Sequence, residues 1–144
     1  MKRIVADVAV LAFVLAACAE NPGTVDSPRR IEVDVAEMAF DPDSIDITPG
    51  ETLEFVITNS GALTHEFLVT NQVDIDEHLE AGHEEGHEEE EKGHEEASLE
   101  VEVEPGETQS LLITFDETDH MARFSCLIEG HYEAGMHGDF EFSG

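Results

Sequence analysis

The stretch that decides how this chain folds is Cys126-Leu127-Ile128-Glu129-Gly130-His131-Tyr132-Glu133-Ala134-Gly135-Met136. Its skeleton is Cys-x4-His-x4-Met, which places a thiol, an imidazole and a thioether within eleven residues. Gly130, Gly135 and the nearby Gly138 allow the positive φ angles and close backbone approaches that a tightly curled loop needs. A strand is predicted just beyond the loop, where acidic and aromatic residues alternate in Asp139-Phe140-Glu141-Phe142.

These three side chains are the soft and borderline donors that a copper ion accepts in both Cu(I) and Cu(II) states. A mononuclear electron-transfer centre of this kind has two His and one Cys in a trigonal set, with a long and weak axial Met. Cys126, His131 and Met136 supply three of the four donors. The second imidazole must come from a distant part of the chain, and His65, in Leu63-Thr64-His65-Glu66-Phe67, is the candidate.

Other donors compete for two of these positions. His137 follows Met136 directly and is the rival of His131 within the loop. Met121 is the second candidate for the axial position. His120 falls in a predicted turn between strands, where a solvent-facing side chain is expected.

The donor set resembles that of the cupredoxins, the blue or type 1 copper proteins. The four-residue gaps of the loop are most similar to those of auracyanin and rusticyanin. The resemblance runs from about Ile31 to Phe142 and implies that one type 1 copper ion is bound. The metal ligands that it implies are His65, Cys126, His131 and Met136.

The resemblance implies electron transfer and no enzymatic activity, so no catalytic residues are predicted. The dinuclear copper centre of oxidases needs a second Cys in the same loop, and this loop has one. Multicopper oxidases need His-x-His pairs and further domains, which this sequence lacks.

Hydrophobic periodicity predicts an all-β protein. Apolar and polar residues alternate, with turn signals between them, in about eight short segments: 31–35, 45–47, 53–57, 64–69, 99–103, 111–115, 124–126 and 140–142. Pro49-Gly50 and Pro105-Gly106 suit the two central positions of a type II turn. No convincing amphipathic helix is predicted. The expected fold is therefore a Greek-key β-sandwich of the cupredoxin kind, formed by residues 31–144.

The N-terminus predicts export. Residues 1–17 combine Lys2 and Arg3 with a largely apolar run that is too short to span a bilayer, as in a secretory signal peptide. The sequence Leu15-Ala16-Ala17-Cys18 resembles the bacterial lipobox, in which Cys18 becomes the lipidated N-terminal residue. An ordinary signal peptide is the alternative. Residues 18–30 are polar and rich in Pro and Gly, which predicts a flexible tether.

Lipidation of Cys18 leaves Cys126 as the single thiol of the exported domain, since the chain has two cysteines. A disulfide between the two would contradict both motifs. A thiolate bound to copper explains why an exported protein keeps one cysteine.

An acidic, His-rich insertion is predicted at about 76–97. Gly-His-Glu-Glu occurs at 82–85, 86–89 and 93–96, and the imidazoles are His78, His83, His87 and His94. Such a tract cannot form a core, whereas His-rich tracts commonly bind Cu(II), Zn(II) or Ni(II). A solvated acidic loop and a metal collector are both compatible with this composition.

Net charge restricts the partners. The formal charge is −29, which excludes nucleic acid on electrostatic grounds and is compatible with a salt-rich habitat. We expect a monomer outside the cytoplasm, lipid-anchored to a membrane, with a redox partner that offers a basic docking patch.

Two functions remain open from the sequence. Electron transfer is favoured, because the donor set suits redox cycling. Copper binding for tolerance, sequestration or delivery is the alternative, with the insertion collecting metal.

Overall fold

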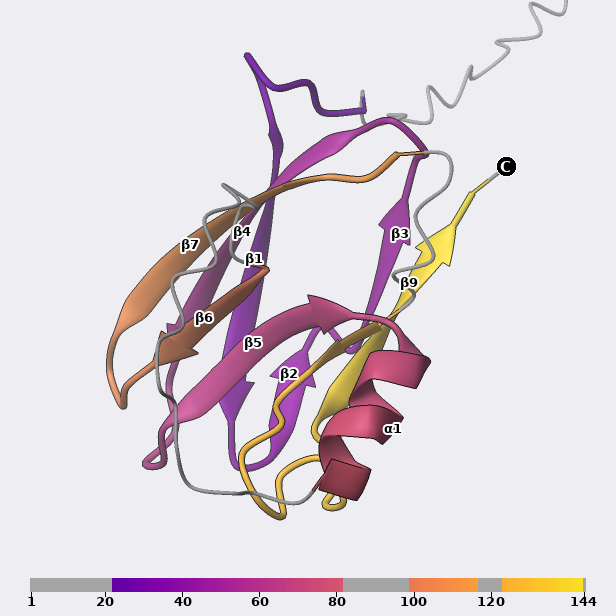
Figure 1. The fold of residues 1–144 in the computed structure, drawn as a ribbon. Coiled ribbons are helices and arrows are strands. Elements are labelled where there is room, and N and C mark those ends of the chain that lie inside the picture. The colour runs from indigo at the N-terminus through magenta and orange to yellow at the C-terminus, as the bar shows by residue number, and fades with distance from the viewer. Residues whose placement is uncertain (1–21, 82–98, 117–122, 144) are drawn as a thin grey trace, which may run out of the picture.

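The computed structural model describes residues 22–81, 99–116 and 123–143, and in this part of the chain two β-sheets pack face to face (Figure 1). The strands are β1 (Arg29–Ala36), β2 (Ala39–Asp41), β3 (Ser44–Ile47), β4 (Thr52–Asn59), β5 (His65–Thr70), β6 (Glu100–Val103), β7 (Thr108–Thr114), β8 (Arg123–Ser125) and β9 (His137–Phe142). The sheet orders are β2-β1-β4-β7 and β3-β9-β8-β5-β6. The predicted all-β sandwich is therefore confirmed.

The two sheets mix parallel and antiparallel neighbours. β1 pairs with β4 and β3 with β9 in parallel, whereas the other pairs are antiparallel. β2 accounts for the ninth described strand. It was not predicted, and its register, with Val35 opposite Phe40, is set by the hairpin that it forms with β1.

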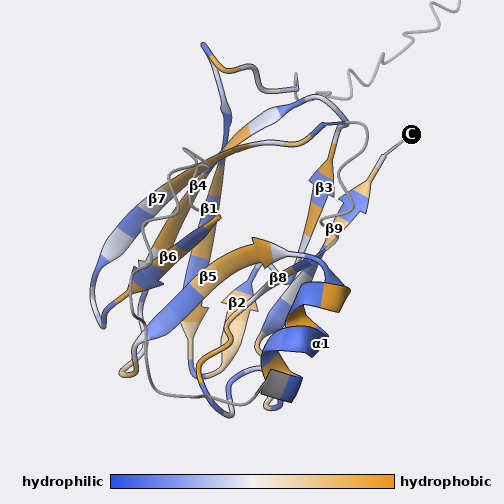
Figure 2. Cartoon of the chain, viewed as in Figure 1, coloured by the Kyte–Doolittle hydropathy of each residue, from blue (hydrophilic) through white to orange (hydrophobic). Residues whose placement is uncertain are grey.

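The core lies between the sheets and is rich in aromatic side chains. Figure 2 shows apolar positions alternating with polar ones along the strands. The Phe67 and Phe124 rings stack with centroids 5.3 Å apart, and Phe40 meets both edge-on at 5.7 and 5.3 Å. Such aromatic pairs stabilise a core beyond the area that they bury. Phe67 and Phe124 belong to β5 and β8 of the five-stranded sheet and Phe40 to β2 of the other sheet, so the cluster joins the two sheets next to the segments that carry the candidate ligands.

The predicted turns at Pro-Gly are confirmed. Gly50 has φ 86° and Gly106 has φ 81°. The amide of Glu51 donates to the carbonyl of Thr48, and the amide of Glu107 donates to that of Glu104. A positive φ at the third residue of each turn is the type II conformation.

One helix, α1 (Gln72–Ala81), interrupts the β-structure, and the prediction that the chain has no convincing helix is wrong on this point. Its periodicity is weak because most of its side chains are polar, and Ile75 is fully buried. The available signal was the cap: Asn71 accepts hydrogen bonds from the amides of Val73 and Asp74 at 2.9 and 3.0 Å. The predicted insertion thus begins inside α1, and 82–97 lies outside the described residues.

The described chain starts at the end of the sandwich opposite the loop between β8 and β9 (Figure 1). The carboxylate of Glu51 is buried there. It accepts hydrogen bonds from Arg29 at 2.7 and 3.0 Å and from the amide of Thr48 at 2.8 Å. Burial by itself would raise the pKa of Glu51, but these hydrogen bonds and the Arg29 charge hold it below its usual value. The ion pair fixes the start of β1, which begins two residues before the predicted domain boundary.

No helix in residues 22–81, 99–116 and 123–143 combines the length and the apolar composition that crossing a membrane requires.

Candidate metal centre

Three predicted ligands from distant parts of the sequence converge at one end of the sandwich. One donor atom from each of His65, Cys126 and His131 lies within 4.8 Å of the others, and all three residues are buried. The Cys126 Sγ lies 3.3 Å from His131 Nδ1, and the two imidazole centroids are 5.1 Å apart. Among the described residues this is the one group of three or more His, Cys, Asp or Glu side chains close enough to hold a metal ion.

Backbone hydrogen bonds close the loop that carries three of the candidates. The amide of Cys126 donates to the carbonyl of Met136 at 3.1 Å, and the amide of Met136 donates to that of His131 at 3.0 Å. Gly130 and Gly135 have φ 82° and 100°, which residues with a side chain rarely adopt. Met136 is fully buried, and these bonds hold its backbone against those of Cys126 and His131.

His65 is positioned by the turn before β5. The buried side chain of Asn59 donates to the carbonyls of Leu63 and Val103 at 2.7 and 2.8 Å, and it accepts from the amide of Gly61 at 2.9 Å. These bonds tie the turn to β6. His65, the first residue of β5, is thereby held against the loop that follows β8.

The polar atoms of His65 point to an occupant. Neither ring nitrogen has a hydrogen-bond partner in the described part of the chain, although the residue is fully buried. Burial lowers the pKa of His65 and the neighbouring His131 lowers it further, against a smaller opposing effect of Glu37. An unpartnered buried imidazole is costly, and the neutral form that a low pKa favours is the form that binds a metal ion. These observations fit a copper ion among the three donors.

Cys126 is shielded in the metal-free protein. Burial raises the pKa of its thiol, and hydrogen bonds from the amides of Glu66 and Ile128 offset this in part. The Glu66 amide lies 3.4 Å from the sulfur. Cys126 would hold a copper ion as a thiolate, after loss of the thiol proton, and the ion would supply redox chemistry. Copper binding is therefore expected to weaken as the pH falls.

A mixed β-sandwich with two His, one Cys and a buried Met at one end defines the class of type 1 copper proteins. The chain belongs to the family of copper binding proteins described as the plastocyanin/azurin family, whose model matches residues 29–142. The inferred family and its metal, copper, are thus confirmed.

Curated relatives are named for copper resistance. The chain is 35% identical over 92 residues to the copper-resistant cuproprotein CopI of Vibrio cholerae, over 64% of this chain and 51% of that protein. It is 32% identical over 134 residues to CopI of Pseudomonas aeruginosa, over 76% of this chain and 74% of the relative. The match thus spans about half of the Vibrio protein's length.

Solved structures of similar fold include an auracyanin and an azurin. Auracyanin from Roseiflexus castenholzii is 18% identical with a TM-score of 0.57, over 80% of this chain and 97% of its own. An azurin from Methylomonas sp. strain J is 15% identical with a TM-score of 0.62, over 81% and 98%. At these identities the likeness shows the fold alone.

The structure thus brings the four predicted ligands to one place, and their bonds to copper stay a prediction. His137 lies outside the group of three and instead contacts the ring of Tyr132, with centroids 5.1 Å apart. His120 and Met121 lie outside the described residues. The role of Asn59 was not predicted, and its signal was its position just after a predicted strand, six residues before His65.

We expect Met136→Gln to keep an intense visible band but to lower the reduction potential. The thioether is a soft donor that favours Cu(I), whereas an amide oxygen favours Cu(II). Voltammetry of the copper-loaded protein measures the change, and Met38→Gln, which replaces a methionine in the β1–β2 turn, is the control. An unchanged potential in Met136→Gln would show that Met136 is not the axial ligand.

Proposed function

We propose that the protein binds one copper ion in a type 1 centre and acts in copper tolerance outside the cytoplasm. The observation that carries the proposal is the buried His65–Cys126–His131 group with its unpartnered imidazole. The relatives named for copper resistance favour tolerance over the electron transfer that the sequence suggested. We propose no catalytic activity for the chain.

Electron transfer is the second candidate, and it has a specific basis. A buried, closely held donor group changes little between Cu(I) and Cu(II), which favours fast electron exchange. Gly130, Ala134 and Gly135 are exposed beside His131, and such small residues let a partner approach the imidazole. The partner in this case would present a basic patch to this acidic protein.

The proposed location rests on the N-terminal sequence. We infer that residues 1–17 direct export and that Cys18 is lipidated, with the chain acting as a monomer. The described chain begins at the end of the sandwich opposite the loop between β8 and β9 (Figure 1). This loop, residues 126–136, is called the copper loop below because it carries Cys126, His131 and Met136. A tether attached at the start of the described chain would turn the copper site away from the membrane.

Cys18→Ala is expected to release the protein from membranes, because it removes the site of the acyl chains. Fractionation of cells followed by immunoblotting measures the distribution. Cys126→Ser serves as the matched control and should remain membrane-bound. Cys18→Ala protein that persists in washed membranes would contradict the lipid anchor.

The two functions separate in cells that lack the native gene. We expect the intact chain to restore growth in copper and Cys126→Ser to fail, while oxygen consumption stays the same in both strains. Slowed respiration in the Cys126→Ser strain, with unchanged copper tolerance, would instead establish electron transfer.

Deletion of 82–97 tests the collector role of the insertion. It leaves α1 and β6 intact, because α1 ends at Ala81 and β6 begins at Glu100. We expect the visible band to persist and weaker Cu(II) equivalents, measured by calorimetry, to be lost. The same stoichiometry in the intact and shortened chains would contradict metal collection by the insertion.

A further inference from the structure

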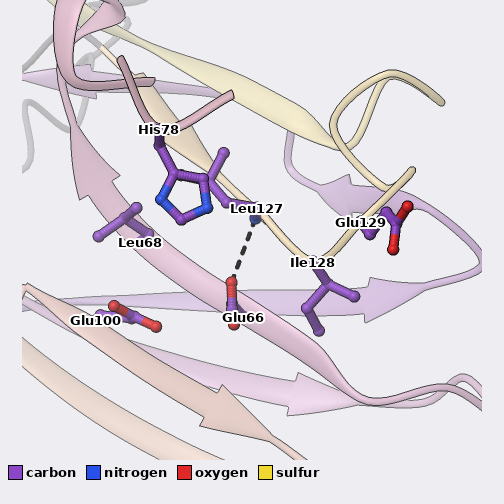
Figure 3. A pocket seen from close by; sticks show the side chains of 7 residues that line it. All are labelled: Glu66, Leu68, His78, Glu100, Leu127, Ile128 and Glu129. Atoms are coloured by element: carbon purple, nitrogen blue, oxygen red, sulfur yellow. Dashed lines mark hydrogen bonds between the residues drawn. The ribbon is translucent and has the colours of Figure 1, made fainter. Parts of the chain in front are cut away.

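Glu66 links the two segments that supply the copper donors. It follows His65 on β5, and its amide donates to the Cys126 sulfur at 3.4 Å. Its carboxylate in turn accepts a hydrogen bond from the amide of Leu127 at 3.3 Å (Figure 3). One residue therefore holds the cysteine from both sides, through its backbone and through its side chain.

The same carboxylate borders an acidic pocket beside Cys126. The pocket measures about 410 Å³, and its charged or titratable side chains are Glu66, His78, Glu100 and Glu129. Figure 3 shows the His78 ring and the Glu66 carboxylate on either side of Leu127. Three of these four side chains are carboxylic acids.

The negative charge of Glu66 lies close to the Cys126 sulfur. The Glu66 carboxylate accepts a hydrogen bond from the amide of Leu127, the residue that follows Cys126 in the chain. A field that disfavours an anionic sulfur also favours the more positive of two metal states. Interactions of this type are strong where water is largely excluded, and Cys126 is fully buried.

We propose that the carboxylate of Glu66, assisted by Glu100, biases the copper centre toward Cu(II). The proposal rests on the type 1 site described above. Negative charge near copper stabilises Cu(II) relative to Cu(I), while the hydrogen bond to Leu127 holds the start of the loop. The lowered reduction potential keeps copper in the oxidised state, which suits retention of the ion.

Two substitutions at Glu66 separate charge from position. Glu66→Gln removes the charge and keeps an oxygen that accepts from the Leu127 amide, whereas Glu66→Ala removes both. Glu100→Gln removes the second charge alone. Glu141→Gln is the matched control, since Glu141 is exposed on β9 and lies opposite Asp46, toward the far end of that strand from His137.

The readouts are the reduction potential and the visible band of each copper-loaded variant. We expect Glu66→Gln to raise the Cu(I) to Cu(II) affinity ratio about tenfold, which is about 59 mV for a one-electron couple. Glu100→Gln should raise it less, and Glu141→Gln should leave it unchanged. In Glu66→Gln the band should keep its position, whereas in Glu66→Ala it should shift.

A potential in Glu66→Gln equal to that of Glu141→Gln would overturn the proposal. Absence of a visible band in the unsubstituted protein would instead refute the type 1 site. The hydrogen bond that places the Glu66 carboxylate beside Leu127 is measured separately in the copper-free protein, by amide hydrogen exchange at Leu127. Faster exchange in Glu66→Ala but not in Glu66→Gln supports the link, and equal exchange in both overturns it.

Discussion

Replacing Cys126 by Ser is expected to abolish the intense visible absorption of the copper-loaded protein completely. The absorption arises from charge transfer between a cysteine thiolate and Cu(II), and no other cysteine lies in the described residues. A hydroxyl is a far weaker ligand, so copper affinity should fall by orders of magnitude. Titration with Cu(II), followed in the visible range, measures both effects.

The fold should survive this substitution. Serine differs from cysteine in one atom, and the aromatic core formed by Phe67 and Phe124 is untouched. Circular dichroism and thermal unfolding of the metal-free variant test this point. A colourless copper complex of the unsubstituted protein would refute the type 1 assignment, whatever the behaviour of the variant.

Gly138→Ala is expected to reduce stability by about 3 kcal/mol, the upper end of the usual range for overpacking a core. A Cβ atom at Gly138 would overlap the ring of Phe124 and lie 2.6 Å from the backbone carbonyl oxygen of Asp43. The ring cannot retreat, because it packs against Phe40, Phe67 and Phe140. Thermal unfolding should show a midpoint lower by about 10 °C or more.

Gly138→Ala should also disturb the conformation of the copper loop, because Gly138 lies two residues after Met136. We expect a broadened visible band in the copper-loaded variant. Gly106→Ala is the control: it also changes a glycine to alanine, but a Cβ there has open space. It should therefore lose only the stability associated with its positive φ. Equal losses in the two variants would show that Phe124 does not require a glycine at position 138.

The sequence by itself determined the fold class and three of the four predicted donors. Alternation of apolar residues in 31–35 and 53–57 is a local property that a sheet buried on one face imposes, so it is visible without a structure. The Cys-x4-His-x4-Met spacing is also local, because all three side chains belong to one loop. The turns at Gly50 and Gly106 were predictable because few other residues adopt a positive φ.

Helix α1 was not predicted from the sequence, and the reason is physical. Its polar sequence carries little periodicity, and it is held in place by its cap at Asn71, by the burial of Ile75 and by a hydrogen bond from Gln72 to Tyr132 in the copper loop. The last two are contacts with residues distant in sequence. Strand β2 was not predicted for a related reason, because its pairing with β1, and not its composition, makes it a strand.

Only the tertiary structure decided which imidazole completes the copper site and what surrounds it. His65 lies 61 positions before Cys126 in the sequence, and pairing of Leu68 with Ser125 between β5 and β8 brings the two together. The same pairing places the Glu66 carboxylate beside the Leu127 amide. Such contacts depend on strand order and register, which local patterns in one sequence do not specify.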